Sequence, residues 1–354
     1  MNKVKRGVLF LITISFLLGL TSCGTKISEE ANEIKIGVTL YKGDDTFIND
    51  IRKDIEALVK SKEEAEACKI TIDFLDANGS VINQGNQIDK FISREYDVIC
   101  VNLVDRTAAA TIIDKAKDAE IPLVFFNREP VEEDMNRWNK IYYVGAQAEQ
   151  SARMQGNIVI NAYEAHKTAV DKNGDEKLQY VILEGELGHQ DAAIRTEYCV
   201  KSVTERGIEL ERLADESANW QSDQGNEKMT NWIREFGSSI EVVFSNNDEM
   251  ALGAIYALKT AEVPSDQWPI IVGVDGIDEA LEAVKEGTMV GTVLSDTYAQ
   301  AMNIVNIAYA LAWGESPEDV AAIRNGKYVL IPHKEITKEN INDFLKKPKK
   351  KEVK

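Results

Sequence analysis

The sequence contains few of the residues and motifs on which nucleotide-binding and hydrolytic proteins depend. Only three of its 354 residues are histidine and four are cysteine, and the histidines, His166, His189 and His333, are far apart in the chain. The chain contains no G-x-x-x-x-G-K-S/T, no G-x-G-x-x-G after its first expected strand, no G-x-S-x-G and no H-E-x-x-H. The usual nucleotide-binding and hydrolase interpretations therefore lack their key residues.

Positive charge is also scarce. Lysine and arginine number 41 against 59 aspartate and glutamate residues, which gives a net charge of −18, and the isoelectric point is about 4.8. This acidic balance argues against nucleic acid as a partner. Hydrophobic residues make up 44% of the chain, and the length is sufficient for two ordinary domains with a large core.

The chain lacks an apolar run long enough to span a bilayer unaided. Residues 8–20 are mostly apolar, follow three basic residues, and lead into the sequence LTSCG at 20–24. This ending resembles the bacterial lipobox, in which signal peptidase cuts before the cysteine and the cysteine is diacylated, with palmitate as the expected acyl group. We therefore expect a lipoprotein signal peptide at 1–22 and lipidation of Cys23. A simple secretory signal with an incidental cysteine is the alternative.

The two polar ends of the mature chain are expected to be connectors. Residues 23–33 predict a tether, which would hold an exported protein on the outer face of the bacterial cytoplasmic membrane. Residues 346–354 form a basic run and predict a solvated tail.

Three further cysteines remain, Cys68, Cys100 and Cys199. An odd number cannot all pair internally. No pairing of cysteine with histidine is evident, so buried free thiols are favoured over catalytic ones.

From residue 34 onward, strand and helix patterns alternate. The strand segments are near-continuous apolar runs, as in a parallel sheet that is buried on both faces, and helical patterns follow most of them. Strands are expected at 34–40, 70–75, 98–102, 122–127, 142–145, 178–183, 208–213, 240–246, 270–274, 289–294 and 328–331.

A looser stretch at 128–140 marks the first expected crossing between two lobes. We expect 34–128 and 297–325 to form an N-terminal lobe, and 129–296 and 326–345 to form a C-terminal lobe. Each lobe would be an α/β unit with a doubly wound, Rossmann-like parallel sheet. The two lobes would close on a ligand by hinge motion, and we expect the protein to be a monomer.

Polar residues gather where the strands end, which in an open parallel sheet is where ligands bind. The stretch at 180–195 shows this best, because a buried strand leads into His189, Asp191 and Arg195, the last two on one helix face. The whole set comprises Asp44, Asp45, Phe47, Asn102, Asp105, Asn127, His189, Asp191, Arg195, Trp220, Asn247, Asp248, Asp275, Ser295 and Asp296. Planar carboxylates and amides can each meet two adjacent hydroxyls of a sugar, and aromatic rings pack on its C–H face. The alternatives are a surface ion pair at 191 and 195, and acidic loops that only cap helices.

Seven stretches resemble one known family: GVTLYKGDDTF (37–47), VNLVDRTAAATII (101–113), IPLVFFNREP (121–130), EGELGHQDAAIRT (184–196), SNNDEMALGAIYALK (245–259), VGVDGIDEAL (272–281) and GTVLSD (291–296). The family is that of the galactose/glucose-binding proteins of bacterial sugar ABC transporters, which have the type I periplasmic binding-protein fold. The resemblance runs from about residue 36 to 336. It implies a receptor for D-galactose, D-glucose or both that carries out no catalysis and presents its closed form to a membrane permease.

The resemblance also implies the binding residues. The sugar ligands carry over to Asp45, Asn102, His189, Asp191, Arg195, Asn247 and Asp275, and the stacking aromatics carry over to Phe47 and Trp220. Ser295 departs from the pattern, since the family has asparagine there. Its hydroxyl is shorter, can bond a sugar through water, and could shift the preference among hexoses.

Residues 171–179 have the alternate spacing of an EF-hand-like calcium loop. The sequence departs from the EF-hand pattern at two positions: Glu176 replaces the usual glycine, and Ile182 replaces the final glutamate. In the resembling family a distant glutamate completes the site, and this implies Glu241. Neighbouring strands in a flavodoxin-like order would bring it close. The expected Ca²⁺ ligands are Asp171, Asn173, Asp175, the carbonyl of Lys177, Gln179 and Glu241; a metal-free turn is the alternative.

Three other classes of function remain as alternatives. A sugar-responsive repressor would need a helix-turn-helix where the signal peptide stands. A sensor that reports sugar to a chemoreceptor or kinase is compatible with the sequence. A sugar-modifying enzyme would have only His189 and Asp191 as an acid/base pair.

Overall fold

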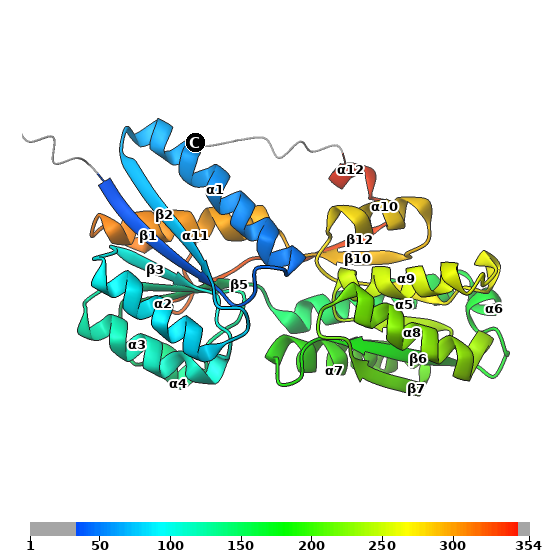
Figure 1. Ribbon diagram of the computed structural model, residues 1–354. Coiled ribbons are helices and arrows are strands. Elements are labelled where there is room, and N and C mark those ends of the chain that lie inside the picture. Colours follow the sequence, from blue (N-terminus) through cyan, green and yellow to red (C-terminus); the bar gives the residue numbers. More distant parts are fainter. Residues whose placement is uncertain (1–32, 346–354) are drawn as a thin grey trace, which may run out of the picture.

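The computed structural model describes residues 33–345, which fold into two α/β lobes that lie side by side (Figure 1). The predicted signal peptide, Cys23 with nearly all of the tether, and the basic tail lie outside the described residues. Within residues 33–345, no helix combines the length and the apolar character that a membrane crossing needs.

The first lobe contains a six-stranded sheet with the order β11-β5-β4-β3-β1-β2, in which every neighbouring pair is parallel. Its strands are β1 (Glu33–Leu40), β2 (Lys69–Asp76), β3 (Val98–Val101), β4 (Leu123–Phe126), β5 (Ile141–Gly145) and β11 (Tyr328–Leu330). Its helices are α1 (Thr46–Glu66), α2 (Val81–Ser93), α3 (Ala109–Asp118), α4 (Glu132–Met135) and α11 (Thr297–Ala312), with 3-10 turns at Arg106–Ala108 and Pro317–Asp319. Helices α1 and α11 pack on one face of the sheet, and α2 and α3 pack on the other.

The second lobe repeats this plan with the order β12-β10-β9-β8-β6-β7, in which only β12 is antiparallel to its neighbour. Its strands are β6 (Lys177–Glu184), β7 (Glu209–Ser217), β8 (Val242–Ser245), β9 (Ile270–Val272), β10 (Gly291–Leu294) and β12 (Lys334–Thr337). Its helices are α5 (Ala148–Ala165), α6 (Lys167–Val170), α7 (Gln190–Glu205), α8 (Ser222–Phe236), α9 (Asp248–Thr260), α10 (Asp278–Glu286) and α12 (Asn342–Leu345), with 3-10 turns at Gly237–Ser239 and Ser265–Gln267. Helices α5 and α7 cover one face, and α8, α9 and α10 cover the other.

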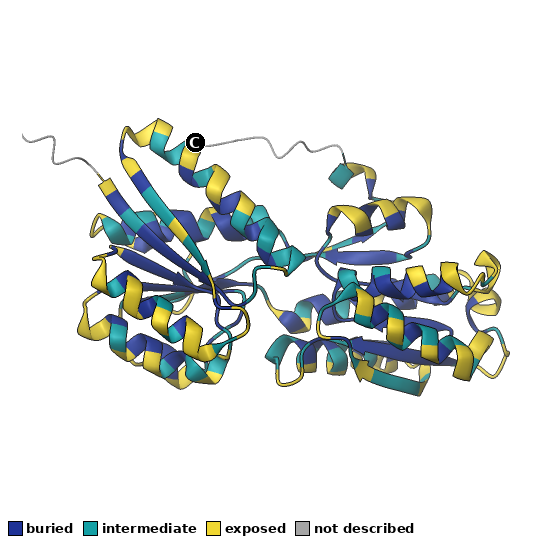
Figure 2. Cartoon of the chain, viewed as in Figure 1, coloured by how far each residue is buried: buried dark blue, intermediate teal, exposed yellow. Residues whose placement is uncertain are grey.

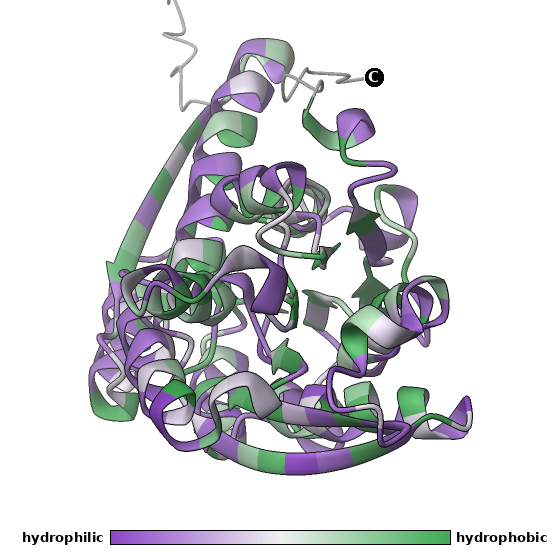
Figure 3. Ribbon diagram, turned by 90° about the vertical axis from the view of Figure 1, so that its right-hand side faces the viewer, coloured by the Kyte–Doolittle hydropathy of each residue, from purple (hydrophilic) through white to green (hydrophobic). Residues whose placement is uncertain are grey.

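The burial pattern explains why these segments form strands. Every residue of β3, β4 and β8 is buried, as expected for central parallel strands between two helix layers (Figure 2). The edge strand β7 is covered less, and along it hydrophilic residues interrupt the hydrophobic ones (at the bottom of Figure 3). The prediction of two doubly wound parallel-sheet lobes is therefore confirmed.

The predicted lobe boundaries need correction in two places. We expected 129–296 in the second lobe, but β5 is parallel to β4 in the first sheet. We expected 326–345 in the second lobe, but β11 pairs with β5, and only β12 returns to the second sheet. The connection from β4 to β5 holds only the one-turn helix α4, so the sequence carries no long helix there to mark a crossover. The chain crosses between the lobes at 145–148, 294–297 and 330–334.

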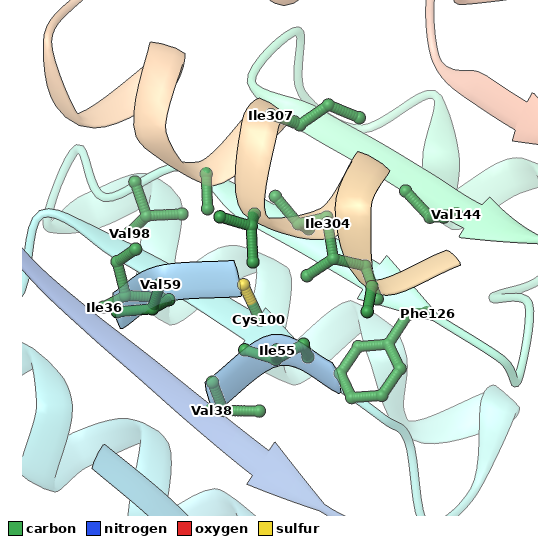
Figure 4. Packing of buried hydrophobic residues seen from close by; sticks show 14 of the residues in the cluster. Ile36, Val38, Ile55, Val59, Val98, Cys100, Phe126, Val144, Ile304 and Ile307 are labelled. Atoms are coloured by element: carbon green, nitrogen blue, oxygen red, sulfur yellow. The ribbon is translucent and has the colours of Figure 1, made fainter. Parts of the chain in front are cut away.

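The core of the first lobe shows how the cysteines are used. In Figure 4 the sulfur of Cys100 lies among aliphatic side chains from β1, α1 and α11. Burial raises the pKa of the Cys100 thiol to about 12, and it does the same to Cys199. All three cysteines of the described residues are free and buried, which confirms the expectation of buried free thiols.

Helices α8 and α9 approach so closely that glycine is required between them. A Cβ atom on Gly253 would lie 2.1 Å from the carbonyl oxygen of Ser222, and a Cβ on Gly225 would lie 2.7 Å from the carbonyl oxygen of Met250. These contacts are with backbone atoms, which cannot move aside as the end of a flexible side chain can.

We expect Gly253→Ala to lower the free energy of unfolding by about 1–3 kcal/mol, because overpacking forces the two helices apart. Urea unfolding followed by circular dichroism measures this. The matched control is Gly85→Ala in α2, where the nearest atom to the added Cβ is Lys115 Nζ at 3.9 Å. That variant should gain about 1 kcal/mol through helix propensity, and an equal response of the two variants would contradict the close approach of α8 and α9.

Candidate functional site

A cleft lies between the lobes at the ends of their parallel strands. It contains about 570 Å³ of empty space, part of it open to solvent. Its lining residues are Tyr41, Asp45, Phe47, Ile48, Asn127, Arg128, Ala146, His189, Asp191, Arg195, Trp220, Asn247, Asp275, Ser295 and Gln300. Nine of the ten predicted ligand-binding residues are in this set, so the structure brings them together around one cavity.

Asn102 is the exception, because it lies behind the cavity wall and is fully buried. Its Oδ1 accepts a hydrogen bond from the backbone N–H of Tyr41 at 3.2 Å, and its Nδ2 donates to Asn127 Oδ1 at 3.0 Å. Asn102 therefore holds the ends of β1 and β4 in place, and Asn127 takes the position on the cavity that we expected for Asn102.

Several cavity residues also cap helices. Asp45 Oδ1 accepts from the N–H of Ile48 at the start of α1, and Asn247 Oδ1 accepts from the N–H of Met250 at the start of α9. His189 caps α7 in the same way through Nδ1. These three residues therefore both cap helices and line the cavity.

The aromatic residues Phe47 and Trp220 line the cavity from opposite lobes. Phe47 lies in the first turn of α1, whereas Trp220 precedes α8 with a left-handed φ of 65°. The indole of Trp220 makes an edge contact with His189 at 5.1 Å between ring centroids. A Cβ on Gly185 would lie 2.1 Å from the indole, so this ring position requires a glycine at 185.

Arg195 is the principal cation on the second-lobe wall and is only 8% exposed. Its Nη1 donates to the carbonyl oxygen of Asn246 at 2.8 Å, and its Nη2 lies 3.8 Å from Asp191 Oδ2. Its Nε is buried without a hydrogen-bond partner. The guanidinium is therefore fixed in direction but retains donor capacity.

The electrostatics of the site are set by burial. Desolvation raises the pKa of the Asp45 and Asp191 carboxyls, and raises that of Asp275 well above its usual range. Desolvation, followed by the nearby Arg128 and Arg195 charges, lowers the pKa of His189 well below 6.5. Buried carboxylates favour a ligand that donates hydrogen bonds, since such bonds stabilise the ionised form.

Two contacts join the lobes on either side of the cavity. Thr46 Oγ1 in α1 donates to Glu249 Oε1 in α9 at 2.6 Å. Arg128 Nη2, after β4, donates to Glu186 Oε2, after β6, at 2.6 Å. The lobes are therefore closed around the cavity.

Four lining residues with polar side chains were not among the predicted ligands: Tyr41, Asn127, Arg128 and Gln300. Asn127 belonged to the strand-end set, and Tyr41 and Arg128 follow strand ends directly, so their positions carried a usable signal. Gln300 carried none, because it lies inside α11, where its Nε2 donates to Ser295 Oγ at 3.3 Å.

The catalytic alternative rested on His189 and Asp191. Nδ1 of His189 accepts from the backbone N–H of Asp191 at 3.1 Å, so this nitrogen serves the helix cap and does not pair with the Asp191 carboxylate. The pair lacks the arrangement in which a carboxylate orients a histidine base.

The predicted calcium ligands lie at the other end of β6, away from the cleft. The expected pairing of β6 with β8 is confirmed. It places Gln179 beside Glu241, whose Oε2 accepts from the Gln179 N–H at 3.0 Å and whose Oε1 accepts from the Lys172 N–H at 2.5 Å. Both Glu241 and Gln179 are buried.

Hydrogen bonds among its own residues shape the loop before β6. Asp171 accepts from the N–H groups of Gly174 and Glu176 at 2.7 and 3.0 Å. Asn173 and Gln179 both donate to Asp175 Oδ2 at 2.9 Å. Glu176 adopts a φ of 67°, so it makes the turn that glycine usually makes.

The loop's donor chemistry suits calcium. The described residues hold no group of three or more His, Cys, Asp or Glu side chains placed to bind a metal. The predicted ligands instead combine carboxylate, amide and backbone carbonyl oxygens, which is the mixture that Ca²⁺ accepts.

Two Rossmann-like lobes, three crossings and a closed polar cavity between strand ends define a solute-binding protein of the type I periplasmic binding-protein fold. Residues 36–316 match the model of the periplasmic binding protein domain family, and the chain belongs to this family.

Individual relatives agree with this assignment. The D-galactose/methyl-galactoside binding periplasmic protein MglB of Haemophilus influenzae is 36% identical over 95% of this chain and 98% of its own length. The xylitol-binding protein of Mycolicibacterium smegmatis is 30% identical over 92% of this chain and 83% of its own. An ABC transporter solute binding protein from Bacillus halodurans, solved with bound myo-inositol, is 31% identical with a TM-score of 0.72 over 88% of this chain and 96% of that chain.

We expect Asn102→Ala to lower the free energy of unfolding by about 1–3 kcal/mol, because it leaves the buried N–H of Tyr41 without an acceptor. Thermal and urea unfolding measure this. Asn161→Ala, at an exposed position in α5, is the control and should stay within about 0.5 kcal/mol of the wild type. A neutral effect of Asn102→Ala would show that Asn102 does not support the cavity wall.

Proposed function

We propose that this protein captures D-galactose, D-glucose or both outside the cytoplasmic membrane and delivers the sugar to an ABC importer. The observation that carries the proposal is the convergence of nine polar and aromatic residues, from both lobes, on one cavity between them. The relative named for D-galactose and methyl-galactoside supports this choice of sugar.

The chemistry of the cavity suits a hexose. Asp45, Asp191 and Asp275 offer acceptors for hydroxyl protons, while Arg195 and Asn247 supply donors. A hydroxyl both donates and accepts, so a polyhydroxylated ring can satisfy both kinds of group. Phe47 and Trp220 would hold its apolar faces.

Ser295 distinguishes this cavity from the pattern it resembles. Its hydroxyl receives a hydrogen bond from Gln300 at 3.3 Å and replaces the donor and acceptor of an amide. We propose that this difference shifts the preference between galactose and glucose, because a site that hydrogen-bonds one hydroxyl discriminates against the epimer lacking it there.

The proposed location follows from the N-terminal motif. The protein would be exported, anchored through lipidated Cys23 and free to reach a membrane permease by its tether. Closure of the lobes on the sugar would give the permease a surface that the open form lacks.

We expect Asp45→Asn to weaken hexose binding by about 10- to 100-fold, because a charge-assisted hydrogen bond is lost. Asparagine is as good a helix cap as aspartate, so α1 should remain intact. Isothermal titration with D-galactose and D-glucose measures the affinity, and circular dichroism checks the fold.

The control for this substitution is Asp296→Asn. Asp296 caps α11 by accepting from the N–H of Ala299 at 2.9 Å, and it is not a lining residue of the cavity. This variant should bind hexose within about twofold of the wild type. Equal affinity of all three proteins would remove Asp45 from the site, and the absence of hexose binding by the wild type would contradict the proposed function.

We also propose that the loop at 171–179, with Glu241, binds a structural Ca²⁺ ion. The supporting features are the oxygen donors of Asp171, Asn173, Asp175, Gln179 and Glu241, and the turn made at Glu176. The carbonyl of Lys177 would complete the set.

We expect Ca²⁺ at about 100 times its dissociation constant to add about 2.7 kcal/mol to the free energy of unfolding. Calorimetric melting with calcium or chelator measures this. In Asp171→Asn the calcium-dependent shift should be lost, while hexose affinity, measured at the other end of β6, should be unchanged. Identical melting temperatures of the wild type with calcium and with chelator would refute the proposal.

A further inference from the structure

Arg128 stands between two cavities. A second cavity, of about 830 Å³ and partly open to solvent, adjoins the one described above. The two share three lining residues: Arg128, His189 and Asp191. His189 belongs to the cap of α7 and Asp191 to its first turn, whereas Arg128 reaches across from the first lobe.

The Arg128 guanidinium is held by three different groups. Its Nη1 donates to the carbonyl oxygen of Val104 at 2.6 Å, and its Nη2 donates to Glu186 Oε2 at 2.6 Å. Its carbon Cζ lies 3.8 Å from the centre of the Tyr41 ring, a cation–π contact. The side chain is only 8% exposed, so it is a fixed part of the wall.

The wall is complete only when the lobes are closed. Val104 and Tyr41 belong to the first lobe, but Glu186 belongs to the loop after β6 in the second. The Glu186 side chain is 46% exposed, so its ion pair with Arg128 lies at the outer edge of the wall. Of the three residues that line both cavities, Arg128 is the one from the first lobe, and its ion pair with Glu186 joins the two lobes at this wall.

Besides its polar and charged residues, the outer cavity has exposed apolar side chains in its lining. Val81, Val104 and Leu187 are among its lining residues, and Val81 and Leu187 are 44% and 78% exposed. Large apolar side chains at a cavity mouth favour an apolar occupant. An alkyl or aryl substituent on a sugar bound in the inner cavity would find such surroundings here.

We infer that Arg128 is a specificity-determining residue, which excludes sugars that carry a bulky substituent on the oxygen facing it. The inference rests on the proposed function, since it concerns which hexose derivatives the same cavity admits. With Arg128 in place the inner cavity holds the free monosaccharide, and without it the substituent extends into the outer cavity.

The test is isothermal titration of wild type, Arg128→Ser and Glu186→Gln. The ligands are D-galactose, D-glucose, and a set of derivatives that each carry one phenyl or benzyl group on a different hydroxyl oxygen. Arg128→Ser opens the passage, so the affinity of at least one derivative relative to its parent hexose should rise about tenfold or more. Glu186→Gln keeps the size of the side chain but removes the ion pair, so the same derivative should gain about threefold.

Arg106→Ser is the matched control. Arg106 lines the outer cavity but not the inner one, and it donates to the carbonyl oxygens of Glu129 and Pro130. This variant enlarges the outer cavity without opening the passage, so hexose affinity and the ratio of derivative to hexose should both stay within about twofold.

Three results would overturn the inference. The first is that the wild type binds every derivative in the set as tightly as the parent hexose, whichever oxygen carries the bulky group. The second is an unchanged ratio in both Arg128→Ser and Glu186→Gln while the hexose still binds, which would leave Arg128 with a structural role only. The third is a wild type that binds neither hexose, which contradicts the proposed function and this inference with it.

Discussion

A helix that follows a parallel strand begins where that strand ends, and its first N–H groups need acceptors. Asp45, His189 and Asn247 supply acceptors for α1, α7 and α9. Because the two sheets direct these same edges toward one cleft, the capping side chains also surround the cavity. Helix formation and ligand binding thus depend on the same few polar residues, and their positions are as fixed as the helices themselves.

Closure concentrates negative charge in a space with little water. Burial raises the pKa of the Asp45, Asp191 and Asp275 carboxyls. Nearby arginines offset this rise in pKa only in part, Arg195 at Asp191 and Asp275 and Arg128 at Asp45. A ligand rich in hydroxyl groups would donate to these carboxylates and so favour the closed form. The contact of Arg128 with Glu186 joins the lobes beside this cavity, so ligand contacts and lobe contacts act in the same direction.

The alternation of strands and helices, and nearly all of the cavity, could be predicted from the sequence, because buried parallel strands and strand-end polar residues are local signals. The lobe boundary after β4 could not, since β5 follows a loop with no long crossover helix. Strand β12 was not predicted, because the antiparallel return to β10 leaves a short, partly exposed segment. Asn102 follows a strand end and was therefore predicted to line the cavity, but its buried side chain bonds to Tyr41 and Asn127, which line the cavity in its place.

Helix α11 and strand β11 belong to the first lobe although nearly the whole second lobe precedes them in the chain. Residues 33–145 therefore cover one face of their sheet only in part, with α1, until α11 has been synthesised, since α11 packs beside α1 there. During passage through an export channel, amino end first, the second lobe has all but its last strand and last helix available before the first lobe can be completed. The first lobe therefore begins first in the chain but is completed last. Until α11 emerges, the incompletely covered apolar face of the first sheet must be shielded.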